Sequence, residues 1–350
     1  SHGRNYITMI RTCFLLLISL AGTQASWAQR PSTLDANVLG FYLIQAFQAR
    51  TSTERLPLNH IGVQVQESAS GYLVTAVLEG YPAHGAGINR GDIIESVDGR
   101  SYHPVYSFND PELAVEEFGA DSLEHELVVR RGENPMVLSL QSVFENLYDS
   151  YRTAMLNSIQ EFTVGNKVIG YIHLWGLSRN SNDLVSLNNI IAQLDHCDGL
   201  IFDLRNSFGY LDLQHLDLVF QDRNRYFDMA GASGRLTSLS SSNGSNIEDP
   251  YRKSITVLVN AGTRGGPELF AYQLNKLDRV TTLGTTSAGQ LGDYRMETPN
   301  STPVLHYQPT NDLLIDGLLF EGRGFVPDTR VEYPYQQTTR GDPQYQAAVR

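Results

Sequence analysis

The segment that most constrains the fold runs from Val257 to Tyr272, where an apolar, β-branched stretch meets a glycine-rich turn and then an amphipathic helical pattern. Many hydrolases present a nucleophile above a sheet on a strand, tight turn and helix in this order. The first backbone N–H groups of such a helix lie where an oxyanion would form. Here the turn reads Arg264-Gly265-Gly266-Pro267, with no Ser, Cys or Thr after Thr263. The sequence therefore predicts the backbone of a catalytic turn without its usual nucleophile.

The composition excludes some classes of protein. A chain of 350 residues with 41% hydrophobic content is long enough for two packed globular domains. Its net charge of −12 argues against a nucleic-acid partner or an anionic membrane surface, because such surfaces need clustered Lys and Arg. Only three of its 26 basic residues are lysines: Lys167, Lys253 and Lys276.

The first residues have the pattern of an export signal. A short basic flank at 9–11 precedes an apolar core at 13–21 and a small-x-small site at Ser26-Trp27-Ala28. Because the apolar core is short for a bilayer span, we expect cleavage after Ala28 and a periplasmic or secreted protein with no integral span. Retention of residues 1–28 as an uncleaved anchor is the alternative.

Residues 34–50 place apolar side chains on one helical face, which predicts a docking helix within an N-terminal segment at 29–57. From 58 to 142 the pattern changes to alternating strands and turns. The run Gly80-Tyr-Pro-Ala-His-Gly-Ala-Gly-Ile-Asn-Arg-Gly-Asp-Ile-Ile-Glu-Ser-Val-Asp-Gly99 resembles a PDZ domain.

That resemblance implies that an extended peptide is added to the sheet as a strand. Its terminal carboxylate would be held by backbone N–H groups near Ile61, Gly62 and Val63. The alternative is a domain that serves only as a rigid spacer or lid.

Residues 143–350 predict an α/β layer fold, because helical and strand patterns alternate. A helical stretch at 145–162 comes before this alternation, and residues 221–250 are polar and turn-rich, as in an insertion or flap. The alternating segments are a strand at 167–174, a helix at 183–194, a buried strand at 199–204 and a strand at 254–259.

This second half is similar to the C-terminal processing, or tail-specific, peptidase family. The similarity is carried, in order, by Ile169–Leu174, Leu200–Asn206 with Gly209, Val257–Asn260 with Glu268 and Ala271, Leu283-Gly284 and Glu321–Asp328. With the PDZ resemblance it covers nearly all of residues 58–350. The expected fold class is an α/β, peptidase-like core preceded by a small, mainly β PDZ domain and an N-terminal helical segment.

The resemblance implies serine-type proteolysis by a Ser–Lys dyad, in which a desolvated lysine takes the proton from the attacking serine. The family's serine falls on Gly265 and its lysine on Gln290, so the catalytic pair is not retained. A glutamine that orients the lysine falls on Tyr294. The oxyanion positions fall on Gly209 and Gly266.

Few other side chains could replace the missing groups. Ser287, near the position of the lost lysine, is the alternative nucleophile, and Thr263 is interpreted as a helix N-cap or a turn hydroxyl. His173 and Cys197 are interpreted as buried core residues. His and carboxylates do not recur at a ligand spacing such as H-E-x-x-H, so the sequence predicts no metal and no other cofactor.

Two functions follow from these observations. In the first, the protein is a pseudoenzyme in which the PDZ domain captures peptide or protein C-termini and the degenerate cleft holds a segment without cleaving it. In the second, it is an active serine-type endopeptidase that cleaves protein tails with a non-standard nucleophile such as Ser287. The replaced dyad favours the first. The sequence carries no sign of the oligomeric state.

Overall fold

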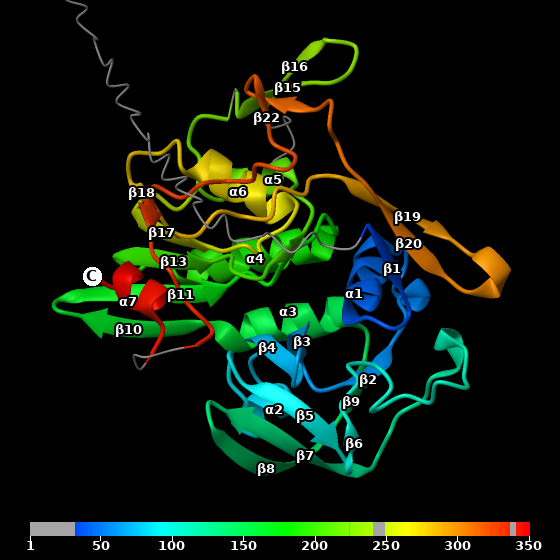
Figure 1. Cartoon of the computed structure of the whole chain (residues 1–350). Helices are drawn as coiled ribbons and strands as arrows, with labels where there is room; N and C mark the ends of the chain where they lie inside the picture. Colours follow the sequence, from blue (N-terminus) through cyan, green and yellow to red (C-terminus); the bar gives the residue numbers. More distant parts are fainter. Residues whose placement is uncertain (1–31, 224, 241–248, 337–340) are drawn as a thin grey trace, which may run out of the picture. The chain divides into compact units, whose positions relative to one another are not determined.

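A six-stranded sheet occupies the centre of the second half of the chain (Figure 1), in the order β10-β11-β13-β17-β18-β23. Strand β10 runs antiparallel to β11, and the other neighbours are parallel. The strands are β10 (Gln160–Val164), β11 (Lys167–His173), β13 (Gly199–Asp203), β17 (Ser254–Val259), β18 (Val280–Gly284) and β23 (Thr329–Arg330). The structure, a computed structural model, describes residues 32–223, 225–240, 249–336 and 341–350, so the predicted export signal lies outside the described residues.

The alternation of side chains along the strands gives this sheet two apolar faces. In β13, Leu200 and Phe202 belong to the main hydrophobic cluster, whereas Ile201 belongs to a separate cluster that includes Tyr345. Buried residues of α4 and α6 are part of the main cluster. The C-terminal helix α7 packs instead against β17 and β18, apart from α4 and α6 (Figure 1).

The helices match the predicted apolar periodicity. The predicted docking helix is α1, which buries Phe41 to Ile44 and Ala46, and the predicted stretch at 145–162 is α3 followed by β10. Asn146 caps α3, because its side chain accepts a hydrogen bond from the Asp149 N–H at 2.9 Å. The α-helices are α1 (Leu39–Gln48), α2 (Pro82–Gly85), α3 (Leu147–Ser158), α4 (Ser181–Gln193), α5 (Leu213–Asp217), α6 (Gly266–Leu274) and α7 (Pro343–Ala348).

Residues 58–142 contain an antiparallel sheet in the order β3-β4-β5-β7-β8, with β6 paired to β5. Its hydrophobic cluster is separate from the main one and includes Ile61, Val74, Ile94 and Leu127. Strand β3 is at one end of the sheet, so its outer edge pairs with no strand among the described residues. The strands are β3 (Val63–Ser68), β4 (Gly71–Val77), β5 (Ile93–Val97), β6 (Arg100–Ser101), β7 (Glu124–Arg131) and β8 (Asn134–Gln141).

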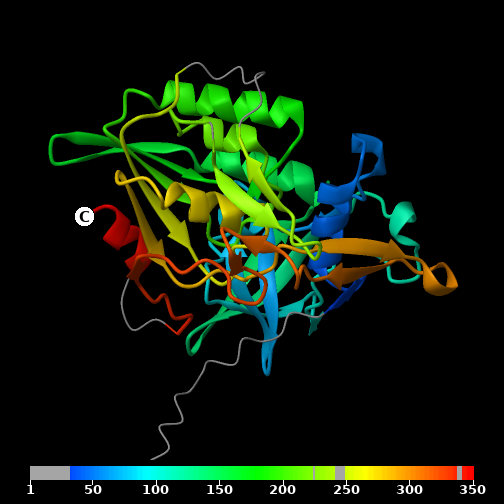
Figure 2. The same cartoon turned by 90° about the horizontal axis from the view of Figure 1, so that it is seen from above.

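Smaller sheets join segments that are distant in sequence. The region predicted as an insertion or flap contains β15 and β16, and β15 also pairs with β21. Figures 1 and 2 both show the orange β19–β20 hairpin running away from the central sheet beside α1. These strands are β1 (Thr33–Asp35), β2 (Leu58–His60), β9 (Val143–Glu145), β12 (Gly176–Leu177), β14 (Phe208–Gly209), β15 (Phe227–Ala230), β16 (Leu236–Leu239), β19 (Asp293–Glu297), β20 (Val304–Gln308), β21 (Leu314–Ile315) and β22 (Leu318–Leu319).

Hydrogen bonds connect the 58–142 sheet to the central fold. The Gln64 side chain donates to the hydroxyl of Tyr151 at 2.6 Å and to the carbonyl of Asn206 at 3.0 Å. The Trp175 indole donates to the Glu79 carboxylate at 2.6 Å. Residues 33–350 accordingly form one compact unit.

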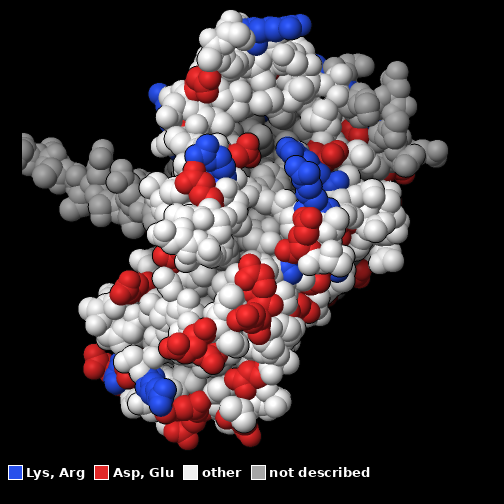
Figure 3. Space-filling view, turned by 90° about the vertical axis from the view of Figure 1, so that its right-hand side faces the viewer, with Lys and Arg blue, Asp and Glu red and all other residues white. Residues whose placement is uncertain are grey.

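Negative charge is concentrated in residues 58–142, which contain thirteen Asp and Glu against four Arg and no Lys. Figure 3 shows one face of the molecule in a space-filling view. Many acidic side chains lie on the lower part of that face, and Lys or Arg side chains lie beside a hollow in its upper part. None of the helices in the described part of the chain is both long and apolar enough to cross a membrane.

Candidate active-site cleft

The turn between β17 and α6 has the predicted course. Gly265 is the residue before the first turn of α6, with φ +72° and ψ −130°. Thr263 is a turn hydroxyl rather than the N-cap of this helix: its Oγ1 donates to the Leu204 carbonyl at 2.7 Å and accepts from the Asn260 N–H at 3.1 Å. These bonds fix the turn to the end of β13.

A cleft of about 670 Å³ opens beside this turn. It is lined by all the positions that the family resemblance selects, although they come from three separate segments of the chain: Gly209, Gly265, Gly266, Gln290 and Tyr294. Most other lining residues are apolar or aromatic, and they include Phe208, Tyr210, Leu211, Phe227, Met229, Leu269, Leu291, Tyr307 and Leu313. The fold therefore brings these five positions together in one cleft.

Backbone atoms occupy the space that the side chain of a nucleophile at position 265 would need. A Cβ atom at residue 265 would lie 2.7 Å from the carbonyl oxygen of Gly209 and 3.9 Å from that of Gln290. A Cβ on Gly266 would overlap the backbone of Tyr210 and Leu211. The loop after β13 thus packs directly against the glycines of the turn.

The buried carboxylate of Glu268 on α6 connects the segments that border the cleft. It accepts hydrogen bonds from the backbone N–H groups of Gly265 at 2.9 Å, Gly289 at 2.5 Å and Gln290 at 3.0 Å. It also accepts one from the Ser287 hydroxyl at 2.5 Å. Burial raises the pKa of Glu268, and these hydrogen bonds oppose that rise. One side chain therefore holds the turn at 265 and the segment at 287–290 together.

Ser287 lies beneath the cleft and is not among its lining residues. It is only 2% exposed, and its Oγ accepts a hydrogen bond from the Phe325 N–H at 2.7 Å while donating to Glu268. Both contacts engage the hydroxyl within the protein. A peptide bound in the cleft would therefore not meet the Ser287 hydroxyl unless the lining moved aside.

The described residues that line the cleft include no lysine and no histidine. Lys253 donates to the carbonyl of Asp195 at 2.6 Å, and Lys276 pairs with Asp316 at 2.5 Å. Lys167 is exposed at the start of β11. General-base catalysis by an amine or imidazole thus has no candidate in the described lining.

His173 is a buried core residue in the structure. Its Nε2 lies 2.7 Å from the carbonyl oxygen of Arg205, and its Nδ1 lies 3.7 Å from Asp203 and 3.6 Å from Glu79. Burial acts to lower the pKa of His173, but the two carboxylates outweigh it and the pKa is raised. The ring therefore connects β11 to residues 58–142 through Glu79.

Arg264, which the sequence analysis did not select, places a positive charge in the cleft. Its guanidinium lies over the ring of Phe208, 5.1 Å from the centroid. It forms no ion pair with any residue in the described ranges. Its position directly before Gly265 could have indicated that it lies in the cleft. A sequence does not show, however, whether an arginine has a carboxylate partner.

The loop predicted to hold a peptide carboxylate, at Ile61, Gly62 and Val63, is tightly packed. Ile61 and Val63 are buried, and Gly62 has φ +80°. The Gly62 N–H donates to Nδ1 of His60 at 3.1 Å. An incoming carboxylate would have to replace this bond.

Gly265→Ser combined with Gln290→Lys restores both residue types of the dyad, yet we expect no cleavage of a tail peptide. A serine Cβ would meet the Gly209 carbonyl, and the positive φ costs a residue with a side chain about 1–3 kcal/mol. Mass spectrometry of the peptide and urea unfolding of the variant measure the two effects.

Gly265→Ala with Gln290→Lys is the matched control, because it adds the same Cβ without the hydroxyl. The two double variants should lose similar stability and be equally inactive. Cleavage by the serine variant alone would show that the Gly209 loop can move aside.

Known proteins resemble this chain in sequence and in fold. Residues 168–331 match the sequence profile of peptidase family S41. Proteins named "Probable CtpA-like serine protease" from Staphylococcus aureus (strain N315) and Staphylococcus haemolyticus (strain JCSC1435) are 23% and 22% identical to the chain. Each match covers 79% of this chain and 53% of the relative, so the chain spans about half the length of these curated relatives.

A solved structure described as the photosystem II D1 C-terminal processing protease is similar in fold. It matches with a TM-score of 0.50 and 21% sequence identity, over 78% of this chain and 72% of that chain. The peptidase resemblance predicted for the second half of the sequence is therefore confirmed: this mixed α/β chain is related to peptidase family S41 through residues 168–331, which include the lining of its cleft.

Proposed function

We propose that this chain is an exported, catalytically inactive relative of the tail-specific peptidases that binds peptide or protein C-termini without cleaving them. The observation that carries the proposal is the cleft at Gly265, where the Gly209 carbonyl faces the missing side chain and no Lys or His lies in the described lining. Nucleophile and base act as a unit in this kind of catalysis, so the loss of both removes the covalent route.

The cleft has apolar walls and a positive charge that could bind a peptide. Its apolar and aromatic walls suit the side chains of an extended segment, and Arg264 offers a charge that no described carboxylate neutralises. A hydrogen bond from a charged donor is worth about 1.5–3 kcal/mol. Arg264 is thus proposed to hold a peptide carbonyl or carboxylate beside the former catalytic turn.

Residues 58–142 are proposed to be the PDZ domain that captures the chain end. Strand β3 leaves its outer edge open among the described residues, as β-strand addition requires. The Gln64 side chain reaches from β3 to the Asn206 carbonyl, at the start of the loop that contacts Gly265. A peptide on β3 would therefore lie near the segment that borders the cleft.

The test is to incubate the protein with a ten-residue tail peptide that ends in apolar residues, and with its C-terminally amidated copy. We expect binding of the free acid, weaker binding of the amide, and no cleavage of either by mass spectrometry. Arg264→Ala should weaken binding about tenfold, which is close to 1.4 kcal/mol. Arg100→Ala, a loss of the same charge from an exposed position on β6, is the control.

Three outcomes would overturn the proposal. Cleavage that is lost in Ser287→Ala would show an active peptidase with its nucleophile away from the family position. Absence of binding to every tail peptide would remove the binding function. Equal binding of the acid and the amide would contradict recognition of a chain end.

A further inference from the structure

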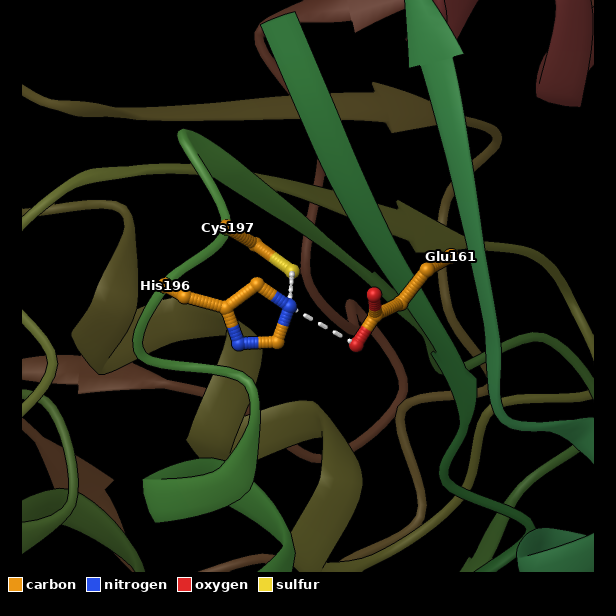
Figure 4. A group of neighbouring side chains, drawn as sticks. All are labelled: Glu161, His196 and Cys197. Carbon is orange, nitrogen blue, oxygen red and sulfur yellow. Dashed lines mark hydrogen bonds and ion pairs between the residues drawn. The ribbon is translucent and has the colours of Figure 1, made fainter.

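A group of metal-ligating side chains, none of which lines the cleft described above, lies between β10 and the loop before β13. Glu161 is on the edge strand β10, and His196 and Cys197 are in the loop between α4 and β13. Nε2 of His196 is 3.0 Å from a carboxylate oxygen of Glu161 and 3.8 Å from Sγ of Cys197. One ligand atom from each residue lies within 4.8 Å of the other two (Figure 4).

Both contacts of His196 use the same ring nitrogen, which excludes one interpretation of the group. A catalytic Cys–His–Glu relay needs the imidazole to meet the thiol with one nitrogen and the carboxylate with the other. Here the thiol and the carboxylate both face Nε2, and Figure 4 shows this nitrogen between them. Three electron-pair donors that converge in this way are arranged for a shared cation.

Two of the three separations in the group are near those in a zinc site. With Zn–S at about 2.3 Å and Zn–N at about 2.0–2.1 Å, a tetrahedral angle places sulfur and nitrogen about 3.5 Å apart. The same geometry places nitrogen and a carboxylate oxygen about 3.4 Å apart. The corresponding distances here are 3.8 Å and 3.0 Å. Sγ of Cys197 and a carboxylate oxygen of Glu161 lie within 4.8 Å of each other, so these two side chains would draw closer together when the ion binds.

The chemistry of the donors selects the ion. Calcium and magnesium take oxygen ligands, whereas thiolate, imidazole and carboxylate together suit zinc. His196 and Glu161 are exposed, with 56% and 44% of their side-chain surfaces accessible, so an ion could enter from solvent and keep water as its fourth ligand.

The backbone beneath the group is held firmly. The Cys197 carbonyl accepts hydrogen bonds from the Tyr251 hydroxyl at 3.0 Å and from Lys253 at 3.2 Å. The Asp198 N–H donates to the Val168 carbonyl at 2.7 Å, and the Asp198 side chain accepts from the Val168 N–H at 2.8 Å. A supported backbone favours binding because less ordering is needed when the ion arrives.

We propose that Glu161, His196 and Cys197 form a zinc-binding site that joins the edge strand β10 to the loop before β13. The sequence analysis predicted no metal, because Glu161 is far from His196 along the chain and no repeated ligand spacing reveals the group. The site is outside the cleft, and its occupancy is independent of whether the cleft binds or cleaves a peptide.

The test uses the chain with Cys13→Ser, so that Cys197 is the sole thiol, freed of metal by a chelator. Zinc is titrated against a chromophoric chelator, and Co²⁺ serves as a spectroscopic substitute. We expect one ion per chain and, with Co²⁺, a near-ultraviolet thiolate charge-transfer band with tetrahedral visible bands. Zinc at 100 times its Kd should also stabilise the fold by about 2.7 kcal/mol.

His196→Ala and Glu161→Gln change exposed side chains, so both variants should fold as the parent does. Each should weaken zinc binding at least tenfold, whereas His84→Ala, which removes another exposed histidine, should leave it unchanged. Cys197→Ser should abolish the charge-transfer band. Binding that is unchanged in His196→Ala, or a Co²⁺ complex without the thiolate band, would overturn the proposal.

Discussion

Glu268→Ala should lower the free energy of unfolding by about 4 kcal/mol or more, because it leaves buried donors without their acceptor. Three backbone N–H groups and the Ser287 hydroxyl donate to this carboxylate, which is fully buried. Each unsatisfied buried donor costs about 1–3 kcal/mol, and the cavity left by the side chain adds to the loss. Urea unfolding followed by circular dichroism measures the effect.

Glu268→Gln and Glu112→Ala make this prediction specific. The amide of glutamine keeps the shape and one acceptor oxygen, so its loss should be intermediate. Glu112 is exposed in the 58–142 sheet region, and its removal should change stability by no more than about 0.5 kcal/mol. A free energy of unfolding for Glu268→Ala within 1 kcal/mol of that of the parent would contradict the prediction. The carboxylate would then not be what holds the turn at 265 and the segment at 287–290 together.

Acidification from pH 6.5 to pH 5 should destabilise the protein through two buried histidines. Burial lowers the pKa of His60 and of His215 to about 4. In both rings Nδ1 accepts a backbone N–H, from Gly62 at 3.1 Å and from Asp212 at 2.9 Å, and protonation would remove that acceptor. The unfolded chain binds the protons at a higher pH than the folded chain, so stability falls as the pH falls through this window.

The expected loss is about 1.5 kcal/mol per histidine between these two pH values. The pKa values of His125, His173, His196 and Glu268 are raised instead. The raised pKa of His173 affects stability mainly above pH 6.5, because there the folded chain keeps a proton on this ring that the unfolded chain has lost. The raised pKa of Glu268 acts in the opposite direction to the two histidines, since an acid of this kind loses stability as the pH rises.

His60→Gln separates the contributions. Between pH 6.5 and pH 5 the unfolding free energy of this variant should fall less than that of the parent. The difference should be about the 1.5 kcal/mol expected for one histidine. His84→Gln, which removes an exposed histidine, is the control. Equal pH dependence in the parent and in His60→Gln would show that His60 is not the group that titrates.

Local elements of this fold follow from local sequence. The β-branched run before the glycines is strand β17, and the pattern after them is α6, because period and turn chemistry are properties of neighbouring residues. The same holds for α1, which begins at Leu39 within the predicted 34–50. The resemblance to a peptidase family then selected Gly265 and Gln290, which the fold places in one cleft.

What the sequence did not predict depends on contacts between distant segments. That the Gly209 carbonyl faces the missing side chain of Gly265 is settled by how the loop after β13 packs on the turn. The lack of an ion-pair partner for Arg264 among the described residues is also a property of the assembled cleft. The approach of Glu161 to Cys197 results from the pairing of β10 with β11.

The C-terminal helix α7 also bears on the order in which the chain can fold during synthesis. Tyr345 on this helix packs against Tyr171 and Phe162, covering one apolar face of the central sheet. Asp342, just before the helix, pairs with Arg205 at 2.7 Å, at the start of the loop that borders the cleft. Both contacts are made by a segment that leaves the ribosome after the strands and the loop that it covers. A nascent chain therefore carries an uncovered apolar face and an unanchored cleft loop until α7 has been made, and a chain that stops before Asp342 should depend on chaperones to remain unaggregated.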